Sequence, residues 1–477
     1  MDEDRKLTQH ERFPLLTPQG EELLKWMHEH ENAPKYNHFC GDRLTAERMR
    51  EVRGFEDDLR ASESATDDRR QQGTDLPGWV ESYVEACRLD VPYYRRVLPH
   101  GAGVSFHDLP SFGRQELTRE FWAFVPDSAS LQDLIRYDSS GRTGHPIRIP
   151  GHPLHAAKYL PLLKRTLRKH GVVLEGEPGK VAILLACAQR RTVTTATIAT
   201  YLNQAGFSKI NLRATDQDWR EPGDVAAYIN ACRPEIITGD PLSFLALCDV
   251  PLAFRPKALV STSMALSPAF RLQIEARVGA PVLNVYSMTE TGPIGVEVYS
   301  ETGDFAGFEI LSHDTYVEIL DEEDNPCPPG VRGEITITGG RNPYLPLIRY
   351  RTGDWGTLDV SGKIPRITQM EGRAPTVFRD ESGALVNNVD VTHVLRPFAL
   401  PQYTLHQSRD GSLRMSRRDG IGTSMGGTGV GSGSGAPNYL IERALQGLFG
   451  RGTRIDIDTL PQDPSESGKV LQYTSDW

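Results

Sequence analysis

The spacing of hydrophobic and polar positions changes twice along this chain of 477 residues. The first 90 residues are rich in charge and read as helices, and segment 44–62 is helix-like, with Thr45 suited to cap its start. From about residue 130, short β-rich runs alternate with helix-like segments. This alternation predicts an α/β domain, in which ligands gather at the carboxyl ends of the strands.

Individual elements of the α/β region follow from the same pattern. Val181 to Ala188 is a continuous aliphatic run, typical of a parallel strand that is covered on both faces. We expect helices over Thr194–Ala205, within 221–235 and over Ser267–Val278, and strands over 208–214 and at the starts of 235–241, 257–263 and 280–292.

The pattern changes again near residue 308. Segment 308–340 reads as strand, turn and strand, interrupted by Asp324–Pro326 and Pro328–Gly330, and predicts an antiparallel subdomain. A smaller α+β segment follows beyond about residue 371, and its glycine-rich stretch 420–435 is interpreted as a loop. We therefore expect a large domain over 1–370, which residues 1–90 complete as a helical extension, and a small domain over 371–477.

Composition narrows the class of protein. The chain has 63 acidic and 53 basic residues, a net charge of −10, which is unfavourable for general nucleic-acid binding. The start has no apolar secretion signal, and the longest aliphatic run is too short to cross a bilayer. The six cysteines form no CxxC pair, as expected for reduced thiols. We expect a cytoplasmic protein with no nucleic-acid or membrane partner.

The first candidate site is the segment Tyr137–Pro146, YDSSGRTGHP. Its hydroxyl residues and glycines would let backbone N–H groups approach a phosphate, with Arg142 and His145 as nearby positive or potentially positive groups. A Ser/Gly turn that joins two strands is the alternative interpretation.

Two more candidates lie at the ends of predicted strands. In Asn284–Pro293, Glu290 could hold a divalent cation, Thr289 could donate to a phosphate and Tyr286 could face a base; the alternative is a polar turn with a buried tyrosine. In Pro346–Gly356, Asp354 follows a glycine and is suited to a ribose diol. The alternative there is a structural ion-pair network of Arg349, Arg351 and Asp354.

In this order, and followed by a late lysine, these segments resemble the adenylate-forming superfamily of acyl-CoA synthetases and peptide-synthetase adenylation domains, in particular its phenylacetate-CoA ligase branch. The resemblance covers about residues 90–477. The superfamily pattern of phosphate loop, Tyr-Gly-x-Thr-Glu turn, Tyr-Arg-Thr-Gly-Asp turn, Gly-Arg junction and Gly-Lys stands here as Ser139–Pro146, Tyr286–Glu290, Tyr350–Asp354, Gly372–Arg373 and Gly468–Lys469.

The resemblance implies a role for each matched residue. The loop residues Ser139, Ser140, Gly141, Arg142, Thr143 and Gly144 would wrap the β- and γ-phosphates of ATP. Tyr286 would stack on adenine near Asn284, Asp354 would bind the ribose near Arg373, Thr289 would contact the α-phosphate, Glu290 would hold Mg²⁺, and Lys469 would bridge the substrate carboxylate and the α-phosphate. The implied activity is ATP- and Mg²⁺-dependent formation of an acyl-adenylate from a small aromatic acid, followed by transfer to CoA.

The sequence departs from the family pattern at four positions. Arg142 and His145 replace a threonine and the lysine of the phosphate loop, which we interpret as a phosphate-binding cation moved to Arg142. Ser287 replaces the glycine after Tyr286. Pro375 stands at the usual hinge aspartate, and because proline fixes φ, rotation of the small domain would fall to the neighbouring residues Ala374 or Thr376.

These departures leave other functions open. The acyl-adenylate could pass to an amine or to a carrier-protein thiol, or the chain could be a non-catalytic nucleotide-binding descendant. The acid would be held by Ile237–Leu242, Ser261–Ala265 and 286–293, but no side chain there identifies it. The sequence also leaves the oligomeric state open, with a homodimer as one option.

Overall fold

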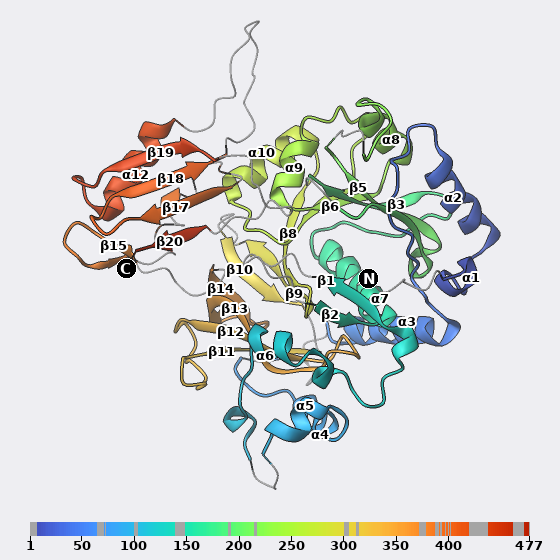
Figure 1. The fold of residues 1–477 in the computed structure, drawn as a ribbon, viewed down its shortest axis with the longest axis horizontal. Helices are drawn as coiled ribbons and strands as arrows, with labels where there is room; N and C mark the ends of the chain where they lie inside the picture. The colour runs from blue at the N-terminus through green and yellow to red at the C-terminus, as the bar shows by residue number, and fades with distance from the viewer. Residues whose placement is uncertain are drawn as a thin grey trace, which may run out of the picture.

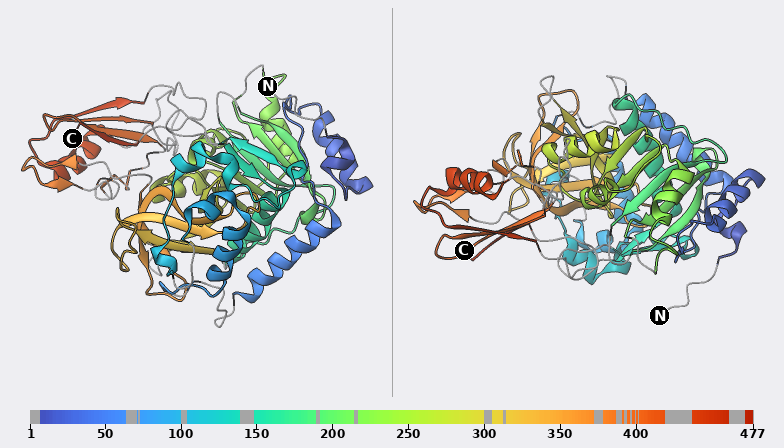
Figure 2. Two further views of the ribbon diagram at one scale, coloured as in Figure 1. Left: turned by 60° about the horizontal axis from the view of Figure 1, so that its bottom comes forward. Right: turned by 90° about the horizontal axis from the view of Figure 1, so that it is seen from above.

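The structure is a computed structural model that describes 7–63, 71, 73–99, 104–138, 148–188, 192–213, 217–299, 305–311, 314–371, 378–386, 391, 394–395, 397–398, 400, 402–418, 437–460 and 472–476. A large mixed sheet with helices forms one domain, and a smaller α+β unit forms the other (Figure 1). Figure 2 shows the small unit at one end of the molecule. The expected fold class is therefore confirmed.

One sheet of twelve strands forms the centre of the large domain, in the order β11-β12-β13-β14-β10-β9-β8-β7-β6-β3-β5-β4. Strand β8 is parallel to β7 and antiparallel to β9, so it joins a mainly parallel half to an antiparallel half. The expected antiparallel subdomain thus continues the same sheet.

The strands of this sheet have the following bounds. The mainly parallel half contains β3 (Val181–Cys187), β4 (Thr195–Ala199), β5 (Ala205–Asn211), β6 (Ile236–Gly239), β7 (Ala258–Ser261) and β8 (Val282–Met288). The antiparallel half contains β9 (Gly292–Tyr299), β10 (Phe305–Ile310), β11 (Thr315–Leu320), β12 (Gly333–Gly339), β13 (Leu347–Asp359) and β14 (Arg366–Glu371). A separate hairpin pairs β1 (Ile135–Asp138) with β2 (Arg148–Gly151).

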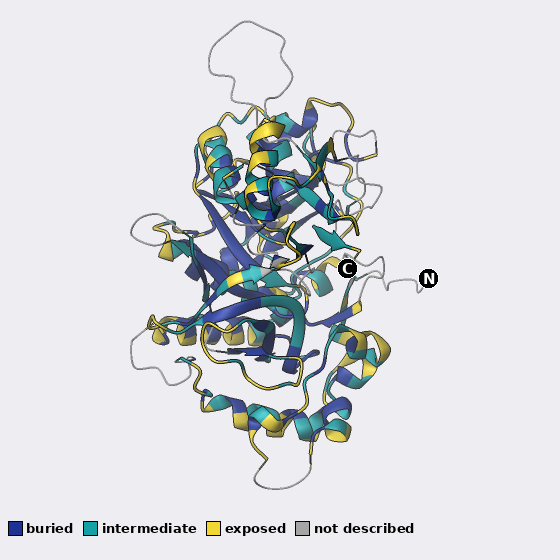
Figure 3. Cartoon of the chain, turned by 90° about the vertical axis from the view of Figure 1, so that its left-hand side faces the viewer, coloured by how far each residue is buried: buried dark blue, intermediate teal, exposed yellow. Residues whose placement is uncertain are grey.

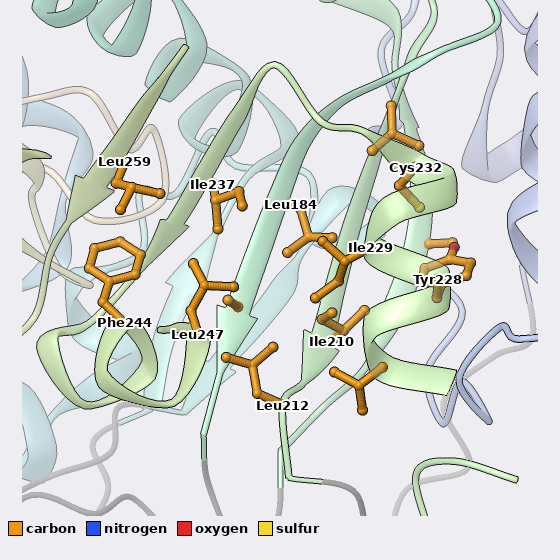
Figure 4. Packing of buried hydrophobic residues seen from close by; sticks show 14 of the residues in the cluster. Leu184, Ile210, Leu212, Tyr228, Ile229, Cys232, Ile237, Phe244, Leu247 and Leu259 are labelled. Atoms are coloured by element: carbon orange, nitrogen blue, oxygen red, sulfur yellow. The ribbon is translucent and has the colours of Figure 1, made fainter. Parts of the chain in front are cut away.

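The parallel strands are covered on both faces, as expected for β3. Successive residues point to opposite sides of a strand. Leu184 and Ile237 join the core against α8 (Asp224–Cys232) and α9 (Pro241–Leu247) (Figure 4). Their neighbours Ile183 and Ile236 join the core on the other face. Each fully buried aliphatic side chain contributes about 1.5–3 kcal/mol relative to an exposed one.

The predicted helix over Thr194–Ala205 is wrong. Thr195 to Ala199 form strand β4, and a short 3-10 helix, η4 (Thr200–Leu202), follows it. Threonine and isoleucine alternate with alanine here, and β-branched side chains favour an extended backbone. Strand β4 pairs antiparallel with β5 at the edge of the sheet, so pairing outweighs the helix-like spacing.

Helices of the first 90 residues pack into the cores of the large domain. Leu23 and Met27 of α2 (Pro18–Glu29) join the core that contains Leu184, and Val52 and Phe55 of α3 (Ala46–Ala61) join the opposite core. Thr45 caps α3 by accepting a hydrogen bond from the N–H of Arg48, as predicted. Figure 3 shows buried strands between helices that expose one side.

The remaining helices of the large domain have these bounds. They are α1 (Gln9–Arg12), α2 (Pro18–Glu29), α3 (Ala46–Ala61), α4 (Trp79–Asp90), α5 (Pro92–Val97), α6 (Arg114–Arg119), α7 (Pro153–Lys169) and α10 (Pro268–Val278), with 3-10 helices η1 (Phe106–Asp108), η2 (Phe121–Phe124) and η3 (Leu131–Asp133). Among the described residues, no helix is long and apolar enough to cross a membrane.

The small unit has its own core. Helix α12 (Asn438–Phe449) packs Ile441 and Leu445 against Leu405 and Met415 of the sheet. The sheet has the order β19-β18-β17-β20, formed by β17 (Tyr403–Gln407), β18 (Leu413–Arg417), β19 (Ile455–Thr459) and β20 (Tyr473–Ser475), beside a hairpin of β15 (Phe378–Arg379) and β16 (Leu385–Val386). The expected boundary near Glu371 stays a prediction because 372–377 lie outside the described residues.

The start of α7 predicts a pH dependence of stability. His152 caps this helix: its Nδ1 accepts a hydrogen bond from the N–H of Leu154 at 3.1 Å, which requires an unprotonated nitrogen. Burial, followed by the charge of Arg48, lowers the pKa of His152 to about 4. Because the pKa of an unfolded histidine is about 6.5, the stability from this neutral cap is fully present above pH 6.5 and is lost as the pH falls toward 4.

The variant His152→Asn keeps a side-chain acceptor for the cap and does not titrate in this range. We expect denaturant unfolding to show a smaller loss of stability between pH 7 and pH 4.5 for this variant than for the wild type. Equal losses in the two proteins would contradict the role given to His152.

Candidate active site

Three strand ends bring the segments expected to hold the acid together. Gly239 and Ser261 are the last residues of β6 and β7, and Asn284, within β8, is the register neighbour of Ser261. Ser261 and Asn284 are buried. Since the carboxyl ends of parallel strands are the usual ligand-binding edge of an α/β sheet, the sheet places Ile237–Leu242, Ser261–Ala265 and the end of β8 at one edge.

A hydrogen bond joins the second and third candidate segments, 68 residues apart in sequence. The hydroxyl of Tyr286 donates to Asp354 Oδ2 at 2.9 Å. Burial, and then the negative charge of Asp354, raises the pKa of Tyr286 well above its usual value, so the phenol stays protonated and able to donate. This bond holds one carboxylate oxygen of Asp354 in place.

The ring of Tyr286 is largely enclosed. It is 6% exposed and packs in a cluster with Ile294 and Phe308. This burial agrees with the alternative interpretation of the turn as a polar segment with a buried tyrosine. Stacking of Tyr286 on adenine stays a prediction.

The turn after β8 presents its two chemical groups differently. Thr289 is exposed, whereas Glu290 is 4% exposed and accepts a hydrogen bond from the hydroxyl of Tyr350 at 3.3 Å. Burial, followed by the charge of Glu290, raises the pKa of Tyr350 well above its usual value, so this phenol is also a donor. The turn is thus tied to β13, the strand that carries Asp354.

Mg²⁺ is the metal that the family resemblance implies, and Glu290 is the carboxylate that the resemblance assigns to it. The described residues contain no group of three or more His, Cys, Asp or Glu side chains that could hold a metal ion. Mg²⁺ is commonly held by one or two carboxylates together with substrate phosphates and water. Glu290 therefore fits an ion that arrives with a nucleotide, and does not fit one held by a dedicated protein cage.

The arginines of the third segment belong to ion pairs. Arg349 is 0% exposed; its Nε lies 3.0 Å from Glu318 Oε1, and it also donates to the carbonyls of His107 and Leu109. Arg351 pairs with Asp324, and with Glu334 at 2.8 Å. The predicted alternative of a structural ion-pair network therefore holds for Arg349 and Arg351. Asp354 instead accepts a hydrogen bond from the hydroxyl of Tyr286.

The glycine before Asp354 lies inside strand β13, at a shift in its pairing with β12. Gly353 has a φ of +77°, and the pairing of β12 with β13 shifts register between Arg351 and Trp355. Glycine adopts this backbone conformation without steric cost. The N–H of Gly353 donates to Glu334 at 2.8 Å, so Asp354 emerges from an irregularity inside a long strand.

The other predicted site residues lie outside the described residues. These are Ser139, Ser140, Gly141, Arg142, Thr143 and Gly144, together with Arg373 and Lys469, and also the departures His145 and Pro375. The phosphate-loop segment joins the two strands of the β1–β2 hairpin, which is the setting of the alternative turn interpretation. Its role toward phosphate stays a prediction.

Two residues beside the candidate turn were not predicted. Arg341, after β12, donates to the carbonyls of Thr291 and Pro293. His155 of α7 also lies close to Gly292. Neither residue stands in a motif. A single arginine after two glycines does not indicate that its side chain will bind backbone carbonyls of another segment.

Comparison with known proteins finds a family match over part of the chain. Residues 194–342 match the AMP-binding enzyme family. The chain is 23% identical over 346 residues to phenylacetate-coenzyme A ligase from Aromatoleum evansii, a match that covers 68% of this chain and 76% of that protein. The resemblance to the adenylate-forming superfamily is confirmed.

Two further comparisons agree with this placement. A segment of 124 residues is 32% identical to oxalate–CoA ligase from Saccharomyces cerevisiae and covers 21% of this chain and 22% of that enzyme. The fold is similar to that of 2-hydroxyisobutyryl-CoA ligase, solved in the postadenylation state in complex with 2-HIB-AMP (TM-score 0.57, 15% identity, 83% of this chain and 88% of that one).

Proposed function

We propose that the protein is an ATP- and Mg²⁺-dependent ligase that activates a small aromatic carboxylic acid as acyl-AMP and transfers the acyl group to CoA. The observation that carries this proposal is a pair of hydrogen bonds between segment 286–290 and segment 350–354. Tyr286 binds Asp354, and Tyr350 binds Glu290, so that the residues proposed for ribose and metal are fixed to each other.

The proposed first reaction requires charge to be neutralised at one phosphorus atom. A carboxylate oxygen of the acid attacks the α-phosphate of ATP; a C–O–P linkage forms, and the bond to pyrophosphate breaks. Both reactants are anions, so a cation at the α-phosphate stabilises the transition state more than the ground state. Lys469 would supply that cation, and Thr289 would donate from its exposed position in the turn.

The other proposed groups act by positioning the nucleotide. Asp354 would accept hydrogen bonds from the ribose hydroxyls, and the hydroxyl of Tyr286 keeps its carboxylate oriented. Glu290 would hold Mg²⁺, which when bound would offset the charge of the phosphates. The loop from Ser139 to Gly144 would hold the β- and γ-phosphates, and Arg373 would lie near the ribose.

The acid and the acceptor are the finer parts of the proposal. The phenylacetate-CoA ligase relative supports an aromatic acid and CoA. Ser287, partly exposed at the end of β8, supports a rival acceptor, because its side chain occupies space where the family pattern has glycine. An amine nucleophile would give an amide in place of a thioester.

The test is product identification with a panel of aryl and alkyl acids. Enzyme, acid and MgATP are incubated with CoA, with an amine pool, or with neither, and the products are identified by mass. We expect acyl-AMP without an acceptor and acyl-CoA with CoA, for at least one aryl acid. Amide as the main product would favour the rival acceptor, and no acyl-AMP from any acid would favour the non-catalytic descendant.

A prediction for the phosphate loop concerns Arg142. If the phosphate-binding cation has moved to this residue, Arg142→Ala should raise the KM for ATP by about 10-fold, the effect of losing roughly 1.4 kcal/mol of a charge-assisted contact. Arg53→Ala, at an exposed position of α3, is the matched control. Equal KM values in the two variants would remove Arg142 from the site.

A further inference from the structure

Arg341 forms a buried link between three segments of the large domain. Its side chain is 5% exposed. Nη1 donates to the carbonyl of Thr291 at 3.3 Å and also to that of Pro293, while Nη2 donates to Thr315 Oγ1 at 2.7 Å. Nε donates to Asp314 Oδ1 at 3.0 Å. One guanidinium therefore ties the turn after β8 to the start of β11.

Helix α7 also lies close to this turn. Gly292 has a φ of +70°, and a Cβ atom added there would lie 3.5 Å from Cε1 of His155 and 3.9 Å from Nη1 of Arg341. The imidazole of His155 also faces the backbone of Thr289. The segment that carries Thr289 and Glu290 is thus in contact with both α7 and Arg341.

Arg341 also stands close to the inward-facing carboxylate. Glu290, Thr291, Arg341 and Asn342 line one cavity of about 10 Å³, the size of about one water molecule. A buried guanidinium is costly unless it is paired, and Asp314 supplies the pairing charge. Nη1 in addition donates to the backbone carbonyls on both sides of Gly292, so the guanidinium contacts the turn itself.

We propose that Arg341 is a positioning residue for adenylation, which fixes the turn so that Thr289 and Glu290 meet the nucleotide and its Mg²⁺ in one orientation. This inference rests on the proposed function of Thr289 and Glu290. Groups that orient a metal ligand typically change metal affinity or activity by about 10–100-fold when removed. A lysine would keep the charge but lose the planar guanidinium, whose three nitrogens reach the turn, Thr315 and Asp314 at once.

The test compares Arg341→Met and Arg341→Lys with Arg165→Met. Arg165 is also fully buried, lies on α7 and donates to the carbonyl of Leu311, so its loss is a matched control for stability alone. MgATP affinity is measured by calorimetry on each full-length protein. ATP–pyrophosphate exchange gives kcat, the KM for ATP and the Mg²⁺ concentration for half-maximal rate.

We expect MgATP affinity to fall by about 10–100-fold in Arg341→Met and less in Arg341→Lys, with a matching rise in the Mg²⁺ requirement, while Arg165→Met changes only the melting temperature. If the Arg341 variants lose stability but keep MgATP affinity and Mg²⁺ requirement, the inference is overturned. Should Arg341→Met fail to fold, the Lys variant carries the same comparison. A wild-type protein that binds MgATP without exchange would contradict the proposed function, and calorimetry would still decide the role of Arg341.

Discussion

Lys469→Ala should slow acyl-adenylate formation by about 10²–10³-fold while leaving the affinity for ATP nearly unchanged. The reason is that charge develops at the α-phosphate only as the carboxylate attacks, so a cation placed there acts mainly on the transition state. Single-turnover formation of acyl-AMP measures the rate, and calorimetry measures ATP binding.

The control for this experiment is Lys363→Ala, at an exposed position between β13 and β14. It should leave both the rate and the affinity as in the wild type. A rate loss in Lys469→Ala no larger than in the control would exclude Lys469 from the chemistry. A loss confined to transfer onto CoA would assign it to the second reaction.

Arg349→Met should lower the free energy of unfolding by about 3–5 kcal/mol, the cost of leaving a buried charge without its partner. The side chain of Glu318, the partner of Arg349, is 3% exposed. Arg349 also donates to the carbonyls of His107 and Leu109, in the segment that leads to the bridge between Phe112 and β13. The measurement is denaturant unfolding of the wild type and of Arg349→Met. The midpoints are compared with the same dependence of the free energy of unfolding on denaturant concentration for both proteins.

Two variants bracket this result. Arg366→Ala removes a partly exposed pair with Asp359 and should cost about 0–1 kcal/mol. Adding Glu318→Leu to Arg349→Met removes the stranded carboxylate and should recover part of the loss. A loss from Arg349→Met as small as that from Arg366→Ala would show that the buried pair does not hold this part of the domain together.

Much of the fold follows from local pattern, and the failures have a physical reason. The aliphatic run of β3 and the capped helices α3 and α10 carry their own signals, namely continuous burial and a serine or threonine N-cap. The stretch Thr194–Ala205 does not, because its fate depends on pairing with β5. Local spacing cannot reveal a partner strand.

The candidate site shows the same division. Tyr286, Glu290 and Asp354 stand in motifs, and the order of these motifs along the chain was enough to predict that the three residues belong to one site. Their hydrogen bonds with each other and with Tyr350 needed the sheet, because β8 and β13 are far apart in sequence. Arg341 contacts the turn through its carbonyls, which every residue possesses, so no pattern of side chains marks it.

The central claim, that this chain forms acyl-adenylates, is tested most directly by ATP–pyrophosphate exchange across a panel of aryl and alkyl acids. Exchange reports the reversible first reaction and does not depend on the acceptor. We expect acid-dependent incorporation of labelled pyrophosphate into ATP with at least one small aromatic acid, abolished when Mg²⁺ is chelated. No exchange with any acid, from a folded protein that binds ATP, would contradict the account.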